Sequence, residues 1–142
     1  MTIVSSFVFE DFREGQAFAF DHALTAADID AYAAATGDVS PLHMDEVFAR
    51  ERGYGGRVAH GLLLAGFVSR LIGVHFPGKN CLLHSASFSF PSPACAGDLL
   101  TVSASVSQLS QASKVMVLQV AVLVKGSGAT AARGKVQLGF TG

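Results

Sequence analysis

The segment AHGLLLAGFVSRLIGVHF, Ala59 to Phe76, decides the fold expected for this chain. It is a long apolar run, and it stops at Pro77-Gly78, a pair that is typical of the end of a helix. Its apolar residues fall on more than one helical stripe. The segment therefore predicts a long helix that other elements must enclose on most sides.

Downstream of this helix the hydrophobic period changes to two, which indicates β-strands. Residues Ser87 to Phe90 and Thr101 to Val106 alternate between polar and apolar side chains. Val115 to Val124 is almost continuously apolar, as expected for a central strand covered on both faces. Gly126-Ser-Gly128 predicts a hairpin turn before a last strand, Ala129 to Phe140.

Upstream of the helix the sequence predicts one strand and two shorter helices. Ala17 to Ala23 alternates like a strand. Thr25 is placed to cap a helix over Ala26 to Ala35, and Gly37 is a stop signal. Asp45 to Arg52 predicts a short helix with its acids early and its bases late.

One strand, then helices, then four antiparallel strands predict an α+β fold. A sheet with so few strands can bury an apolar helix by wrapping around it. This arrangement is called the hot-dog fold. We therefore expect residues 1–142 to form a single hot-dog domain, with a five-stranded antiparallel sheet around a long central helix. An exposed sheet edge and an oily second face predict that two copies pair as a homodimer.

Composition excludes several classes of protein. Half of the 142 residues are apolar, the net charge is −1, and the basic residues are scattered, so we expect no nucleic-acid partner. The N-terminus lacks a signal-peptide pattern, and the longest apolar run is too short to span a bilayer. The two cysteines, Cys81 and Cys95, have neither metal-site nor CxxC spacing. These features predict a soluble cytoplasmic protein with reduced thiols.

Chemistry-bearing residues gather just before the central helix. The stretch GDVSPLHMD carries Asp38 and His43 on a segment broken by Pro41, and Gly61 follows in the first turn of the helix. An acid and an imidazole on one loop can share proton transfers. A backbone N–H at a helix start lacks an intrahelical acceptor and lies in a positive field. The stretch predicts an acid–base site.

These residues resemble the MaoC-like R-specific enoyl-CoA hydratases and 3-hydroxyacyl-thioester dehydratases. Their motif is D-x-N-P-x-H followed by His-Gly at the start of the central helix, with Ser40 here in place of the Asn. The similarity runs from Ala17 to Leu138, and its specific part covers residues 37–73. It implies reversible hydration of trans-2-enoyl thioesters and dehydration of R-3-hydroxyacyl thioesters, in which CoA or an acyl carrier protein carries the acyl group. The resemblance also implies that the reaction uses no metal and no redox cofactor.

The resemblance implies catalytic roles for three residues. Asp38 and His43 would hold the water that adds across the double bond, with Asp38 as base and His43 as proton relay. The Gly61 N–H would bind the thioester oxygen. Structural roles stay open beside these: an Asx turn at Asp38, a packing histidine at His43, and close packing at Gly61.

Four further residues are candidates for substrate binding. Ser40 offers a hydroxyl with a shorter reach than the side-chain amide of the family's Asn. This difference can lower activity or alter substrate choice. His60 is expected to orient the start of the helix rather than to take part in the chemistry. Ser69 matches a family position near the acyl pocket, with a buried serine that bonds to its own helix backbone as an equal alternative. Arg57 could meet the phosphates of CoA or of a carrier arm, although an ordinary solvated base is the favoured interpretation.

Other readings of the sequence compete with the hydratase. The five histidines form no close ligand pair, so no metal site is expected. A hot-dog thioesterase needs an acid that activates water at the carbonyl, and the D-x-S-P-x-H loop argues against it. A non-catalytic acyl-thioester-binding or partner subunit is the alternative from a different class.

Overall fold

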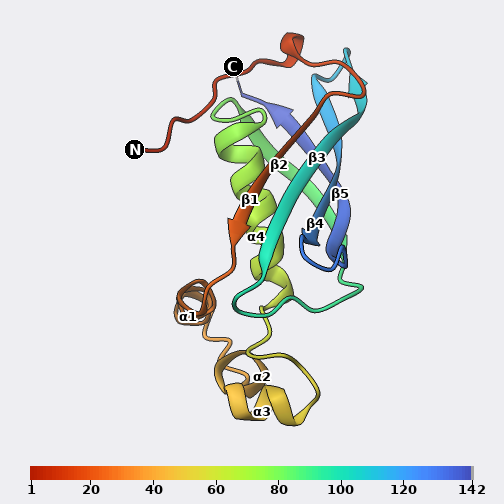
Figure 1. Cartoon of the computed structure of the whole chain (residues 1–142). Helices are drawn as coiled ribbons and strands as arrows, with labels where there is room; N and C mark the ends of the chain where they lie inside the picture. Colours follow the sequence, from red (N-terminus) through yellow and green to blue (C-terminus); the bar gives the residue numbers. More distant parts are fainter. Residues whose placement is uncertain (142) are drawn as a thin grey trace.

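Five antiparallel strands wrap around one central helix in the computed structural model, which describes residues 1–141 (Figure 1). The strands are β1 (Ala17–Ala23), β2 (Cys81–Ser89), β3 (Leu99–Ser110), β4 (Val115–Val124) and β5 (Thr130–Phe140). Their order in the sheet is β1-β3-β4-β5-β2. This arrangement confirms the expected α+β hot-dog architecture.

Shorter helices lie beyond one end of the sheet, and the central helix runs along its concave face (Figure 1). They are α1 (Ala26–Thr36), α2 (Pro41–Met44), α3 (Glu46–Glu51) and α4 (Gly61–Arg70), and α4 continues as a π-helical turn over Leu71–His75. A short 3-10 turn, Phe9–Asp11, precedes β1. The one-turn helix α2 was not predicted, because four residues carry too little periodicity and Pro41 indicates the end of a helix rather than its start. Proline at the first position of a helix is in fact favourable, since that N–H needs no intrahelical acceptor.

Local signals set the ends of α1 as expected. The Thr25 hydroxyl accepts a hydrogen bond from the Asp28 N–H at 3.1 Å, and the Asp28 carboxylate accepts one from the Thr25 N–H at 3.0 Å. This reciprocal capping box satisfies two donors at the helix start. Gly37 ends the helix in the left-handed region, with φ of 80°. The chain then turns toward α2 and the predicted site.

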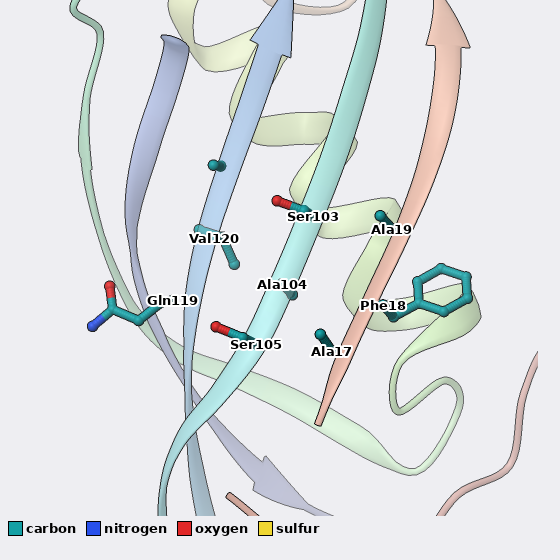
Figure 2. Close-up of a pocket in the computed structure, with 9 residues that line it drawn as sticks. Ala17, Phe18, Ala19, Ser103, Ala104, Ser105, Gln119 and Val120 are labelled. Atoms are coloured by element: carbon teal, nitrogen blue, oxygen red, sulfur yellow. The ribbon is translucent and has the colours of Figure 1, made fainter. Parts of the chain in front are cut away.

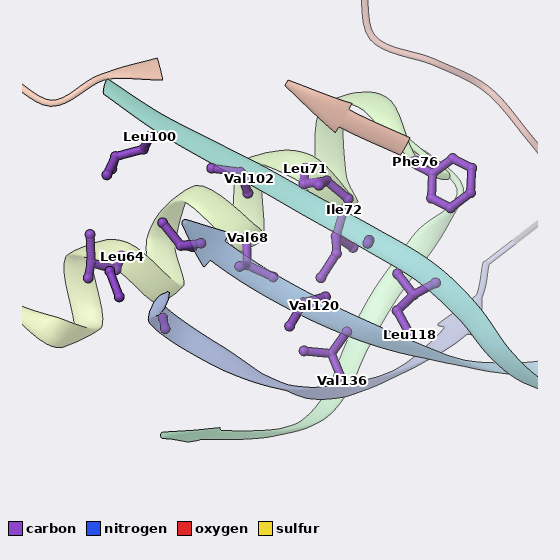
Figure 3. Close-up of a cluster of buried hydrophobic side chains, with 14 of the residues drawn as sticks. Leu64, Val68, Leu71, Ile72, Phe76, Leu100, Val102, Leu118, Val120 and Val136 are labelled. Atoms are coloured by element: carbon purple, nitrogen blue, oxygen red, sulfur yellow. The ribbon is translucent and has the colours of Figure 1, made fainter. Parts of the chain in front are cut away.

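The core lies between α4 and the concave face of the sheet, as Figure 3 shows. Leu64, Val68 and Leu71 form one buried helical stripe. Facing them are buried side chains of three strands: Leu100, Val102, Leu118, Val120 and Val136. Full burial of one such side chain contributes about 1.5–3 kcal/mol. This stripe anchors α4 and therefore fixes the position of its first turn.

Two expectations about burial were wrong. Within one chain α4 is not enclosed on most sides: Leu62 is 64% exposed, and Gly66 and Ser69 also face outward. The central strand β4 is not covered on both faces, because its side chains alternate between buried and partly exposed. Five strands cover one side of a helix, and a single helix covers one face of the sheet.

The outer face of the sheet carries small side chains. A shallow pocket of about 430 Å³ lies there. Figure 2 shows the alanine and serine side chains of β1 and β3 that line it. Ala17 lies opposite Ser105, and Ala19 opposite Ser103.

No helix among residues 1–141 combines the length and apolarity needed to cross a bilayer.

Candidate active site

Asp38 lies in the turn between α1 and α2, and local hydrogen bonds hold it in place. Its N–H donates to the Thr36 hydroxyl at 3.2 Å. Its carboxylate oxygen Oδ1 accepts a weak hydrogen bond from the Ser40 N–H at 3.3 Å, which forms an Asx turn. The side chain is exposed, so the second carboxylate oxygen is free to meet water. The Asx turn and an acid–base role are therefore compatible.

His43 lies on α2, not on a loop as the sequence suggested, and one of its ring nitrogens contacts a backbone carbonyl. Its Nδ1 lies 2.7 Å from the Val58 carbonyl oxygen. A carbonyl only accepts, so Nδ1 carries the proton and donates it to this bond. In the neutral ring Nε2 is then unprotonated. This nitrogen is able to accept and pass on a proton.

Asp38, His43 and His60 form a compact cluster, in which the sequence predicted the pairing of Asp38 with His43 but not the place of His60 beside them. Their potential ligand atoms all lie within 4.8 Å of one another. The rings of His43 and His60 are stacked, with centroids 3.9 Å apart and 28° between their planes. A metal ion binds an imidazole nitrogen near the ring plane at about 2.0–2.1 Å. Two stacked rings cannot both aim a lone pair at one ion, so this geometry suits packing and proton transfer better than metal binding.

Gly61 is the first residue of α4, so its N–H has no intrahelical acceptor. The ring of Phe90 packs against it: a Cβ added at Gly61 would lie 3.3 Å from two ring carbons. Gly61 and Phe90 also line a pocket of about 250 Å³, together with residues that include Tyr54 and Leu64. The positively polarised start of α4 therefore borders a small pocket at Gly61. A larger side chain at this position would crowd the ring of Phe90.

Arg57 makes internal contacts that the sequence did not predict. Its Nε–H donates to the His43 carbonyl oxygen at 2.6 Å, and its guanidinium pairs with the Asp30 carboxylate. Only 16% of its side chain is exposed. These contacts tie α2 to α1 and hold the end of the helix that carries His43. A direct role of Arg57 in substrate binding stays a prediction.

The two serine candidates lie in different surroundings. Ser40 supports the turn through its backbone: its N–H meets Asp38, and its carbonyl accepts from the His43 N–H at 2.9 Å. These contacts do not need the side-chain amide of the family's Asn. Ser69 lies on the exposed side of α4, in line with Leu62 and Gly66. Contact of either serine with substrate stays a prediction.

Sequence reasoning missed several residues of the site. Val58 supplies the acceptor for His43, Tyr32 packs on His60 at 4.5 Å between ring centroids, and Phe90 packs on Gly61. Asp30 pairs with Arg57. None of these has a local signal, because each acts through a neighbour that is distant in the sequence.

The two cysteines do not supply a nucleophile. Both thiols are free. Burial raises the pKa of Cys81, and burial followed by the charge of Asp98 raises the pKa of Cys95. The thiolate is the reactive form of cysteine, so both side chains are weak nucleophiles near neutral pH.

The chain is similar to known proteins in both sequence and structure. The family described as "MaoC like domain" matches residues 11–127. An (R)-specific enoyl-CoA hydratase of Rhodospirillum rubrum is 31% identical over 83% of this chain and 82% of its own length. A 3-hydroxybutyryl-CoA dehydratase of Methylorubrum extorquens is 34% identical over 71% of this chain and 64% of its own. Among solved structures, an (R)-hydratase from Aeromonas caviae involved in PHA biosynthesis superposes with a TM-score of 0.87 at 31% identity, covering 92% of this chain and 98% of that one.

Proposed function

This chain belongs to the MaoC-like domain family, and from that premise we propose that it hydrates trans-2-enoyl thioesters and dehydrates R-3-hydroxyacyl thioesters through Asp38, His43 and Gly61. One observation carries the assignment. A carboxylate and an imidazole, each with one free atom, lie together beside a helix that begins at Gly61. The acyl group is carried by CoA or by an acyl carrier protein. Two free thiols accord with a cytoplasmic location.

The reaction needs one proton to leave water and one to reach C2. As the water oxygen bonds to C3, the free oxygen of Asp38 takes a proton, and the electron pair of the double bond moves to the thioester oxygen. The Gly61 N–H stabilises this enolate oxygen. The proton passes through Nε2 of His43 to C2, the carbonyl re-forms, and the R-3-hydroxyacyl thioester leaves. One water is consumed, and neither carbon chain nor protein is oxidised.

The test is the loss of conjugated-enoyl absorbance when the protein is added to crotonyl-CoA, with octenoyl-CoA measured alongside. We expect rapid loss and formation of the R-3-hydroxyacyl product. Release of free CoA without hydration would instead assign a thioesterase. Binding without turnover, with both CoA and carrier-protein substrates, would contradict the proposal and assign a non-catalytic acyl-binding role.

Removing the Gly61 N–H should slow the reaction by about 10²–10³-fold, the usual cost of one oxyanion donor. Gly61→Pro does this with little cost to the helix, because proline suits the first helical position and His60 already has the extended ψ of 135° that precedes proline. Gly61→Ala is the control: it also crowds Phe90 but keeps the N–H. Equal kcat values for the two variants would rule out an oxyanion role.

We propose further that the protein is a homodimer built on β2. This edge strand pairs with β5 on one side, and its apolar side chains are uncovered: Leu82 is 60% and Leu83 45% exposed. Leu62 of α4 is also uncovered. Pairing with a second copy would satisfy the strand edge and bury this apolar surface.

Leu83→Asp is expected to shift the dimer to monomer, because it places a charge in the proposed interface. Sedimentation velocity across a concentration series measures the change. Val47→Asp is the matched control, since Val47 is 65% exposed on α3, away from β2. A wild-type protein that stays monomeric at high concentration would overturn this proposal and leave the catalytic one standing.

A further inference from the structure

His60 is the one polar or charged side chain buried in the described part of the chain, with 2% of its surface exposed. A buried polar group of this kind needs a hydrogen-bond partner. Its Nε2 lies 2.9 Å from the backbone carbonyl oxygen of Asp38, which can only accept, so Nε2 carries the proton and donates. The other nitrogen, Nδ1, has no partner among residues 1–141.

The contact with Asp38 completes the support of that residue. The Asp38 N–H is held by Thr36, its Oδ1 by Ser40, and its carbonyl by His60. Three bonds on three different groups leave the second carboxylate oxygen as the free one. Without His60, the peptide that follows Asp38 could rotate and change the direction of the carboxylate.

The stacking of His60 on His43 restricts a rotation of the His43 ring that the hydrogen bond of His43 still allows. The bond from Nδ1 to Val58 sets one direction in the ring plane but allows rotation about its own axis. The His60 ring, 3.9 Å away and within 28° of parallel, blocks that rotation. Tyr32 contacts the His60 ring at 4.5 Å between centroids and helps to hold it. The direction of Nε2 of His43 is therefore set by His60.

His60 is also joined covalently to Gly61 and is the N-cap residue of α4. The residue therefore touches all three proposed catalytic groups: the backbone of Asp38, the ring of His43 and the N–H donor of the next residue. The buried stripe of α4 holds this end of the helix against the sheet (Figure 3). His60 therefore connects the packed core of α4 to the exposed turn that carries Asp38.

We propose that His60 is a positioning residue that sets the mutual geometry of Asp38, His43 and Gly61, without proton transfer of its own. The inference rests on the proposed hydratase function. Its two contacts are separable: the N–H bond acts on Asp38, and the ring face acts on His43. Misplacement of reacting groups by about 1 Å can cost on the order of 10²-fold in rate.

Two variants separate these contacts. His60→Phe keeps a ring against His43 and removes the donor to Asp38. His60→Gln keeps an amide donor within reach of the carbonyl and removes the ring. We expect each to lower kcat with crotonyl-CoA, by on the order of 10²-fold for His60→Phe, with little change in KM. Circular dichroism melts establish that the variants are folded.

His75→Phe is the matched control. His75 lies at the opposite end of the same helical segment, stacked on Phe18 with centroids 5.3 Å apart. Burial, and then the charge of Arg70, lower the pKa of His75, which favours the neutral form of this packed imidazole. We expect its replacement to leave kcat unchanged.

A double-variant cycle distinguishes positioning from general stability. If His60 acts through the Asp38–His43 pair, adding His60→Phe to Asp38→Asn should lower the residual rate little further. Equal losses in both backgrounds, or full activity of His60→Phe, would overturn the inference. An inactive wild-type protein would instead overturn the proposed function, so the two failures are distinguishable.

Discussion

Asp38→Asn is expected to lower kcat for crotonyl-CoA hydration by about 10²–10⁴-fold, the usual contribution of a general acid–base group. Asparagine keeps an oxygen that can accept from the Ser40 N–H, so the Asx turn should survive. What is lost is the charge and the basicity of the free carboxylate oxygen. Stopped-flow measurement of enoyl absorbance gives kcat and KM separately, and KM should change little.

Asp45→Asn is the control for this prediction. Asp45 makes the same kind of local bond, accepting from the Phe48 N–H at 3.1 Å as the N-cap of α3. Asparagine is an equally good N-cap, so neither folding nor turnover should change. Wild-type rates in Asp38→Asn would remove Asp38 from the mechanism and leave it as the residue of a turn.

His43→Asn is expected to have an effect of similar size, about 10²–10⁴-fold on kcat. The asparagine amide can replace the Nδ1–H donor to Val58, which keeps α2 attached to the segment before α4. The variant loses Nε2, the nitrogen proposed to relay the proton, and the ring that stacks on His60. The same assay measures it.

The control for His43 is His22→Asn, in which another half-buried histidine that bonds a carboxylate, Asp28, is replaced. Turnover of the folded control should be unaffected. The double variant Asp38→Asn with His43→Asn should be little slower than either single variant, because residues that act as one unit are not additive. Fully multiplicative losses would mean that the two groups work in separate steps.

Much of the fold was predictable because its signals are local. The capping box of Thr25 and Asp28, the glycine that ends α1, and the alternation that marks β1 each depend on residues within a few positions. The bounds of β1 and β4 were predicted to the residue. The helix α2 was missed because its four residues carry too little periodicity to reveal it.

The sequence by itself determined the sheet-around-helix architecture and the order of the motif residues, since hydrophobic period and turn chemistry act over short distances. Tertiary structure alone decided which groups meet. The bond from His60 to Asp38 joins residues 22 positions apart, and that from His43 to Val58 joins residues 15 apart. Such contacts depend on how α4 packs on the sheet. The uncovered side of α4 and the free edge of β2 follow from the same cause, because one five-stranded sheet covers only one side of the helix that it curves around.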